Sequence, residues 1–149
     1  MRKIFFIVGA FILLIPSVGW NSLAAGPVFY GEAAWYGRHD RTDSWIHKMT
    51  ASGEAFDENA LTCAMRRRDF GQWYRVTNLD NGKSVIVKHN DYGPAMKWRD
   101  PRTGKTHDLS RRVIDLSKGA FARIASRDQG LLKRVKVERI VKARAPKKA

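Results

Sequence analysis

Residues 75–94 read RVTNLDNGKSVIVKHNDYGP, and their first part has the pattern of a β-hairpin. Two runs that contain branched apolar residues, residues 75–79 and 84–88, flank the sequence Asp80-Asn81-Gly82. Asn and Gly accept the positive φ angles that tight hairpin turns require. We therefore expect two antiparallel strands here, in a chain built mainly of β-structure.

Two polar segments that each contain glycine carry the candidate acids. They are TASGEAFD at residues 50–57 and KHNDYGP at residues 88–94. A tight turn on a rigid scaffold can present a carboxylate in a cleft, so Glu54, Asp57 and Asp91 are the first candidates for chemistry. Asp and Gly are also ordinary turn residues. The alternative is therefore that Asp57 caps a turn and Asp91 closes a β-loop.

Further segments follow one another in a definite order along the chain. They are GEAAWYG (31–37), TASGEAFD (50–57), LTCAM (61–65), RVTNLDNGKSVIV (75–87), NDYGP (90–94) and VIDLSKGAF (113–121). In these segments the chain resembles the rare lipoprotein A (RlpA) family of lytic transglycosylases, over about residues 31–140. The resemblance implies a mainly β fold, namely a six-stranded double-psi β-barrel with one or two short helices.

The N-terminal segment has the features of a secretory signal peptide. Arg2 and Lys3 precede an uncharged apolar run, residues 4–15, and small residues follow up to Ala24. Such a run is short for a membrane span, so we expect residues 1–24 to be removed, with an uncleaved anchor as the alternative. Many members of the resembled family are lipoproteins attached through a cysteine after the signal peptide, and this chain has no cysteine there. We expect an exported protein of the periplasm or cell envelope that is not a lipoprotein.

The rest of the chain is long enough for one domain with one core. We expect the RlpA-like barrel to occupy residues 25–141, followed by a basic tail at residues 142–149. The mature protein is expected to be a monomer without a transmembrane span. Residues 38–49 and 95–112 are polar and basic, and we expect them to form long loops that flank the acidic segments.

Two local patterns complete the expected elements. Ser117 follows an apolar stretch and precedes apolar residues at helical spacing, which predicts a short helix over residues 118–126 with Ser117 as its cap. Gly130 ends that connection. Apolar residues then alternate with charged ones over residues 135–140, which predicts a closing strand.

The charge and cysteine content limit the possible partners. The net charge of +14 favours anionic partners, and for an exported chain these are cell-wall and membrane-surface groups rather than nucleic acid. A merely solvated C-terminal tail is the alternative. Cys63 is the only cysteine, so no intramolecular disulfide can form, and the four histidines lack the spacing of a zinc pair. We expect no metal and no cofactor.

The resemblance also implies a chemistry. A lytic transglycosylase protonates the glycosidic oxygen while the primary hydroxyl of the muramic acid attacks, so an anhydro-sugar end forms without water. By the family motif, Asp91 matches the essential acid, which afterwards acts as base. Glu54 and Asp57 match supporting residues in the same groove. Repulsion from two neighbouring carboxylates would favour the proton-donating form of Asp91.

Four further residues are candidates for binding the sugar. Asn90 and Tyr92 can bind sugar hydroxyls, and Trp98 lies in a polar loop where its ring can stack on a sugar face. The family's LTAAH segment ends in histidine where this chain has Met65, which cannot exchange a proton. In one hypothesis His89 replaces that histidine and contacts substrate. In the others cleavage is weakened, or the groove binds glycan without cutting it.

Two functions fit these patterns. The first is an endolytic peptidoglycan lytic transglycosylase that cleaves the MurNAc-GlcNAc bond of glycan strands, with Asp91 as general acid and base. The second is a non-catalytic, expansin-like barrel that binds cell-wall polysaccharide. Three clustered acids favour the enzyme, because a binding groove gains nothing from them. Met65 favours the binder.

Overall fold

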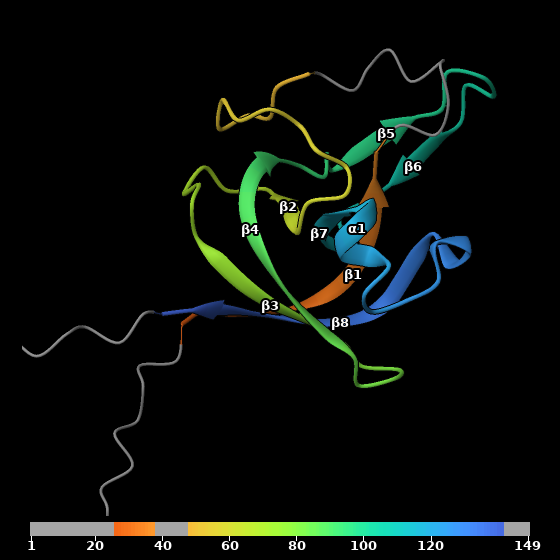
Figure 1. The fold of residues 1–149 in the computed structure, drawn as a ribbon. Helices are drawn as coiled ribbons and strands as arrows, with labels where there is room; N and C mark the ends of the chain where they lie inside the picture. The colour runs from red at the N-terminus through yellow and green to blue at the C-terminus, as the bar shows by residue number, and fades with distance from the viewer. Residues whose placement is uncertain (1–25, 38–47, 142–149) are drawn as a thin grey trace, which may run out of the picture.

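The computed structural model describes residues 26–37 and 48–141 (Figure 1). Six strands form one closed barrel in the order β1-β7-β2-β4-β3-β8, and β5 pairs with β6 in a separate two-stranded sheet. The elements are β1 (Val28–Tyr36), β2 (Thr62–Met65), β3 (Trp73–Asn78), β4 (Ser84–Tyr92), β5 (Lys97–Arg99), β6 (Thr106–Asp108), β7 (Arg112–Ser117), α1 (Lys118–Phe121), the 3-10 turn η1 (Arg127–Gln129) and β8 (Leu131–Ile140). The expected six-stranded, mainly β architecture with short helical segments is confirmed.

The hairpin expected around Gly82 is formed by β3 and β4. The two strands pair antiparallel, with Val76 opposite Val85. Gly82 has a φ angle of 73°, which favours glycine, and its N–H donates to the carbonyl of Asn78 at 2.8 Å. The turn chemistry seen in the sequence therefore sets the register of these strands.

The strand order places residues that are far apart in the sequence on neighbouring strands. Two pairs, β1 with β7 and β2 with β4, are parallel, while β2 and β7 run antiparallel. The short strand β2 therefore lies between β4 and β7. Ala64 of β2 is the register partner of Asp91 on β4 and of Asp115 on β7. These pairings between strands that are distant in the sequence bring two acidic segments to one side of the barrel.

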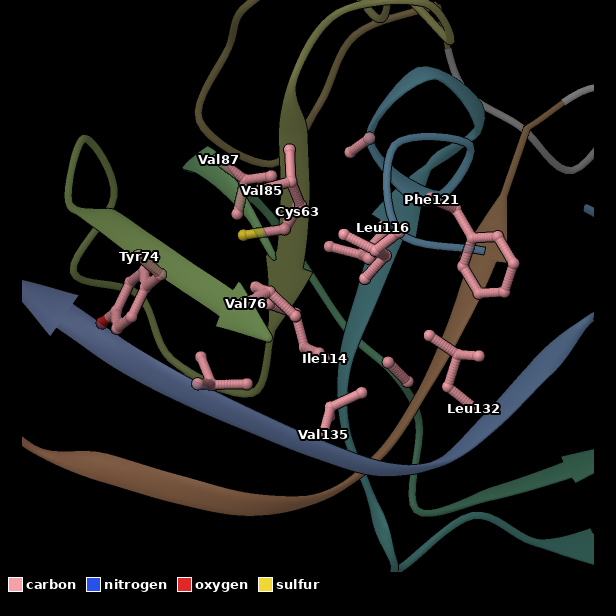
Figure 2. Close-up of a cluster of buried hydrophobic side chains, with 14 of the residues drawn as sticks. Cys63, Tyr74, Val76, Val85, Val87, Ile114, Leu116, Phe121, Leu132 and Val135 are labelled. Atoms are coloured by element: carbon pink, nitrogen blue, oxygen red, sulfur yellow. The ribbon is translucent and has the colours of Figure 1, made fainter. Parts of the chain in front are cut away.

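Alternate residues of the strands fill the barrel interior. Figure 2 shows Cys63, Val76, Val87, Ile114 and Leu116 converging from four different strands, and all five are fully buried. Burial of branched apolar side chains on a closed sheet is the main source of stability in such a fold.

Ser117 caps the short helix α1, as expected. Its hydroxyl accepts a hydrogen bond from the N–H of Ala120 at 3.2 Å and donates one to the carbonyl of Ala60. The helix is shorter than expected and ends at Phe121, because residues 122–124 form turns and residue 125 a bend. Gly119 allows close packing here, since a Cβ at this position would lie 2.2 Å from the carbonyl oxygen of Asn59. The segment before β2 is thus fixed against α1.

Residues 95–112, expected to be a loop, contain the β5–β6 hairpin, in which Trp98 pairs with His107. Figure 1 shows this hairpin and the segment before β2 at the same end of the barrel, opposite the β3–β4 turn. The expected signal peptide (1–24), most of the first expected loop (38–47) and the expected basic tail (142–149) lie outside the described residues. Within the described part, no helix is both long enough and apolar enough to cross a membrane.

Candidate functional site

A half-open groove of about 890 Å³ lies at this end of the barrel. Its lining combines two carboxyl groups with several aromatic rings and two arginines. The residues that matter for the following argument are Asp91, Asp115, Tyr36, Tyr92, Trp98 and Arg68. A concave, partly apolar surface with a few convergent polar groups is the usual form of a ligand site.

Asp91 is held in the groove by backbone N–H groups. Its Oδ1 accepts hydrogen bonds from the N–H of Ala51 at 2.9 Å and of Tyr92 at 2.8 Å. The loop around Ala51 is itself fixed, because the N–H of Ser52 donates to the carbonyl of Asn90 at 3.0 Å. The TASGE segment therefore orients Asp91 through its main chain.

Glu54 does not line the groove. Its carboxylate pairs with the ammonium of Lys88 and accepts a hydrogen bond from Asn90 Nδ2 at 3.1 Å. The hydrogen bond from Lys88, followed by that from Asn90, lowers the pKa of Glu54 below its ordinary value. Glu54 therefore remains a carboxylate and holds the loop against β4.

Asp57 lies in a turn at the surface. Its side chain is exposed, and its Oδ1 accepts a hydrogen bond from the N–H of Asn59 at 2.9 Å. This is the turn-capping role that the sequence offered as the alternative. Of the three acids predicted to cluster, the described structure places only Asp91 in the groove.

The second carboxyl group of the groove belongs to Asp115, which the sequence interpretation missed. Asp91 and Asp115 are the register partners of Ala64 on its two sides, so their Cα atoms are roughly 10 Å apart, two strand spacings. Burial raises the pKa of Asp115 to about 6, opposed by the nearby Arg112 and Arg66. An acid between the buried residues Ile114 and Leu116 was the available signal.

Tyr36, at the end of β1, also lines the groove and was not predicted as a site residue. Burial raises the pKa of the Tyr36 hydroxyl well above its ordinary range, the charge of Asp91 raises it further, and Thr62 opposes the shift weakly. The group is therefore a neutral phenol throughout the physiological pH range. It can donate a hydrogen bond but does not act as a base.

The shifted pKa of Asp115 predicts how stability depends on pH. The folded pKa lies above the ordinary value of 3.8, so the folded state keeps a proton that the unfolded chain has lost, and this contribution disappears as pH rises through 6. We expect the parent to gain about 1 kcal/mol of unfolding free energy from this group at pH 5 relative to pH 7, and Asp115→Asn to lose that gain. Urea unfolding at both pH values measures it. An identical pH dependence in parent and variant would contradict the assignment.

The four predicted sugar-binding residues fall into two groups. Tyr92 and Trp98 line the groove and are about half exposed. His89 is fully buried, and its Nε2 lies 3.0 Å from the carbonyl oxygen of Asp91. Asn90 is also buried and bonds Glu54. His89 and Asn90 thus support the strand behind Asp91, and their side chains do not reach a ligand in the groove.

Met65 is a core residue. Its side chain is 2% exposed and belongs to the main apolar cluster, whereas its neighbour Ala64 faces the groove. Successive residues of a strand point to opposite faces, which explains the difference. His89 therefore does not replace a groove histidine at position 65.

The wall formed by the β5–β6 hairpin is attached to the barrel by Arg66. Its guanidinium donates to the carbonyls of Pro94 at 2.9 Å and of Leu109 at 2.6 Å. On this wall the rings of Trp98 and His107 contact each other, with centroids 5.5 Å apart. No group of three His, Cys, Asp or Glu side chains suited to a metal ion occurs within residues 26–37 and 48–141.

Known proteins resemble this chain in sequence or in fold. The sequence profile of the lytic transglycolase family matches residues 28–137. A probable endolytic peptidoglycan transglycosylase RlpA of Synechocystis sp. is 43% identical over 101 residues, covering 68% of this chain and 26% of the relative. The endolytic peptidoglycan transglycosylase RlpA of Pseudomonas aeruginosa is 40% identical over 110 residues, covering 74% of this chain and 27% of the relative. The chain thus spans about a quarter of the length of these curated relatives.

Among solved structures, the Streptomyces papain inhibitor aligns with a TM-score of 0.56 at 20% sequence identity. The alignment covers 79% of this chain and 98% of the inhibitor, and at this identity it supports the fold alone. Together with the closed six-stranded barrel, the profile match assigns the family. The chain belongs to the lytic transglycolase family as an RlpA-like double-psi β-barrel domain.

Proposed function

We propose that this domain is an endolytic peptidoglycan lytic transglycosylase with Asp91 as its general acid and base. The observation that carries the proposal is the position of Asp91, which lines the groove with one oxygen fixed by two backbone N–H groups. The relatives named above carry this activity in their names, although each is about four times as long as the matched part.

The fixed oxygen leaves the other one for the reaction. Oδ1 of Asp91 takes both backbone hydrogen bonds, and Oδ2 has no hydrogen-bond partner among the described residues. A proton on Oδ2 passes to the glycosidic oxygen as its bond to C1 of the muramic acid breaks. The muramic acid's own primary hydroxyl then bonds to C1, and the Asp91 carboxylate takes up the hydroxyl proton. The products are a new sugar hydroxyl and an anhydro end, and no water is consumed.

Asp115 has a complementary role in this proposal. A glycan strand that lies over Ala64 has Asp91 on one side and Asp115 on the other. The ionised form of Asp115 stabilises the positive charge that develops on the sugar ring as the bond breaks.

The aromatic wall supplies binding energy. Trp98 presents an exposed ring beside His107, and Tyr92 follows Asp91 directly on β4. Sugar faces stack on such rings, as in other glycan sites with partly exposed aromatic residues. The excess positive charge of the chain holds the exported, monomeric protein near anionic groups of the envelope.

The binding-only function is the second candidate, since the groove contains one of the three predicted acids and its aromatic wall alone can hold a glycan. Purified sacculi separate the two functions. We expect the protein to sediment with sacculi and also to release soluble glycan fragments over time. Sedimentation without any release, at concentrations that saturate the sacculi, would favour the binding barrel.

A further inference from the structure

Three consecutive arginines follow β2 and make three different kinds of contact. Arg66 donates to the carbonyls that fix the groove wall, and Arg67 pairs with Asp69 at 3.2 Å. Arg68 lines the groove, and its guanidinium carbon lies 4.6 Å from the centroid of the Tyr92 ring. Each of the first two therefore serves the protein itself, and the third faces the ligand space.

Arg68 keeps its hydrogen-bond donors available. Among the described residues, Arg68 has no carboxylate partner and no hydrogen-bond acceptor. Its guanidinium contacts the Tyr92 ring, and a contact with an aromatic face does not use the N–H groups. Arg112 also lines the groove, but its Nη1 lies 3.6 Å from Asp115. Arg68 is thus the groove arginine whose charge no described carboxylate balances.

The position of Arg68 relates it to the reacting bond. Its ring partner Tyr92 is the residue after Asp91, and both line the groove. A planar guanidinium held in one place recognises a carboxylate through two parallel N–H···O bonds. A neutral polysaccharide offers no such group, whereas peptidoglycan carries carboxylates on its lactyl ethers or on its stem peptides.

The geometry points to Arg68 as the residue that recognises a carboxylate of the peptidoglycan strand beside the bond that Asp91 cleaves. This assignment rests on the proposed function for its substrate. It makes Arg68 a specificity-determining residue, which selects acidic glycan strands over neutral ones, and Tyr92 the residue that positions it.

Three strand preparations test the assignment by binding. The first carries stem peptides, the second is stripped of peptides by an amidase so that the lactyl carboxylates are free, and the third is the stripped strand with its carboxylates converted to methylamides. Binding is measured in the Asp91→Asn background, so that cleavage does not consume the probe. The variants are Arg68→Ala and Arg68→Lys. The control is Arg134→Ala, which removes the same charge from a residue that pairs with Asp80 and does not line the groove.

We expect Arg68→Ala to weaken binding about tenfold on at least one carboxylate-bearing strand and not on the methylamide strand, the size expected for hydrogen bonds to a charged group. Arg68→Lys is expected to restore part of the loss, and Arg134→Ala to bind all three strands like the background protein. An effect confined to the stripped strand identifies the lactyl carboxylate as the ligand, and an effect confined to the first strand identifies the stem peptide.

Equal weakening on all three strands, or no weakening on any, would overturn the role of Arg68. These outcomes are independent of the proposed activity. If the parent cleaves none of the strands, the enzyme proposal fails, but the difference between carboxylate and methylamide strands still decides what Arg68 recognises.

Discussion

Replacing Asp91 with Asn is expected to lower the rate of glycan cleavage about 10²- to 10⁴-fold while leaving the fold and strand binding intact. Asn keeps the side-chain oxygen that accepts the N–H groups of Ala51 and Tyr92. It cannot donate a proton to a glycosidic oxygen and take one back. The loss should therefore appear in the rate of product release and not in affinity.

Release of soluble fragments from sacculi measures the rate, and sedimentation with sacculi measures binding. Asp80→Asn is a matched control, because this substitution makes the same chemical change at a residue in the exposed turn between β3 and β4. We expect this control to cleave at the parental rate. Turnover of Asp91→Asn within threefold of the parent would remove Asp91 from the catalytic role.

Met65→His is expected to cost about 3 kcal/mol of unfolding free energy and to bring no gain in cleavage. Met65 is buried in the apolar cluster, so an imidazole at this position loses packing and leaves its ring nitrogens without partners. Urea unfolding measures the change. Met65→Leu, which conserves volume and polarity, should cost less than about 1.5 kcal/mol.

A stable Met65→His protein with faster cleavage would contradict the core position of Met65. It would show that the side chain at this position reaches the groove. In that case the departure from the family's histidine would be a direct loss of catalytic power, as one of the hypotheses drawn from the sequence holds.

Local patterns in the sequence predicted the local elements well. The Asn81-Gly82 turn predicts the hairpin of β3 and β4, and Ser117 predicts the start of α1, because both depend on residues within a few positions of each other. The helix ends earlier than its apolar spacing suggests. Phe121 and Ile124 are both buried, but the residues between them form turns that pack on the barrel.

The residues that line the groove could not be predicted in the same way, because the groove depends on contacts between segments that are far apart in the sequence. The resemblance to the family implied that Glu54, Asp57 and Asp91 share one groove, yet Glu54 pairs with Lys88, Asp57 caps a turn and Asp91 lines the groove. The carboxyl group that does lie across the groove from Asp91 belongs to Asp115 on β7, and β2 lies between the two strands. That neighbourhood depends on which strands pair in parallel, and pairing over long distances in the sequence leaves no trace in either segment alone.

The sequence also did not show which face of its strand a residue occupies. Met65 and Ala64 are adjacent, and in the short strand β2 a shift of one residue exchanges the groove for the core. Strand β2 alternates regularly, with Cys63 and Met65 in the core and Ala64 in the groove, but the letters TCAM do not show which set faces the core. In contrast, Trp98 was expected on a binding surface because its polar neighbours indicate exposure, and it lines the groove.

The most direct test of the central claim is the structure of the new glycan ends. Sacculi are digested in water enriched in heavy oxygen, and the masses of the released fragments are measured. The account predicts ends one water molecule lighter than a reducing end and free of the isotope, because the muramic acid's own hydroxyl replaces water. Fragments with isotope-labelled reducing ends, or no new ends above those of the Asp91→Asn protein, would contradict it.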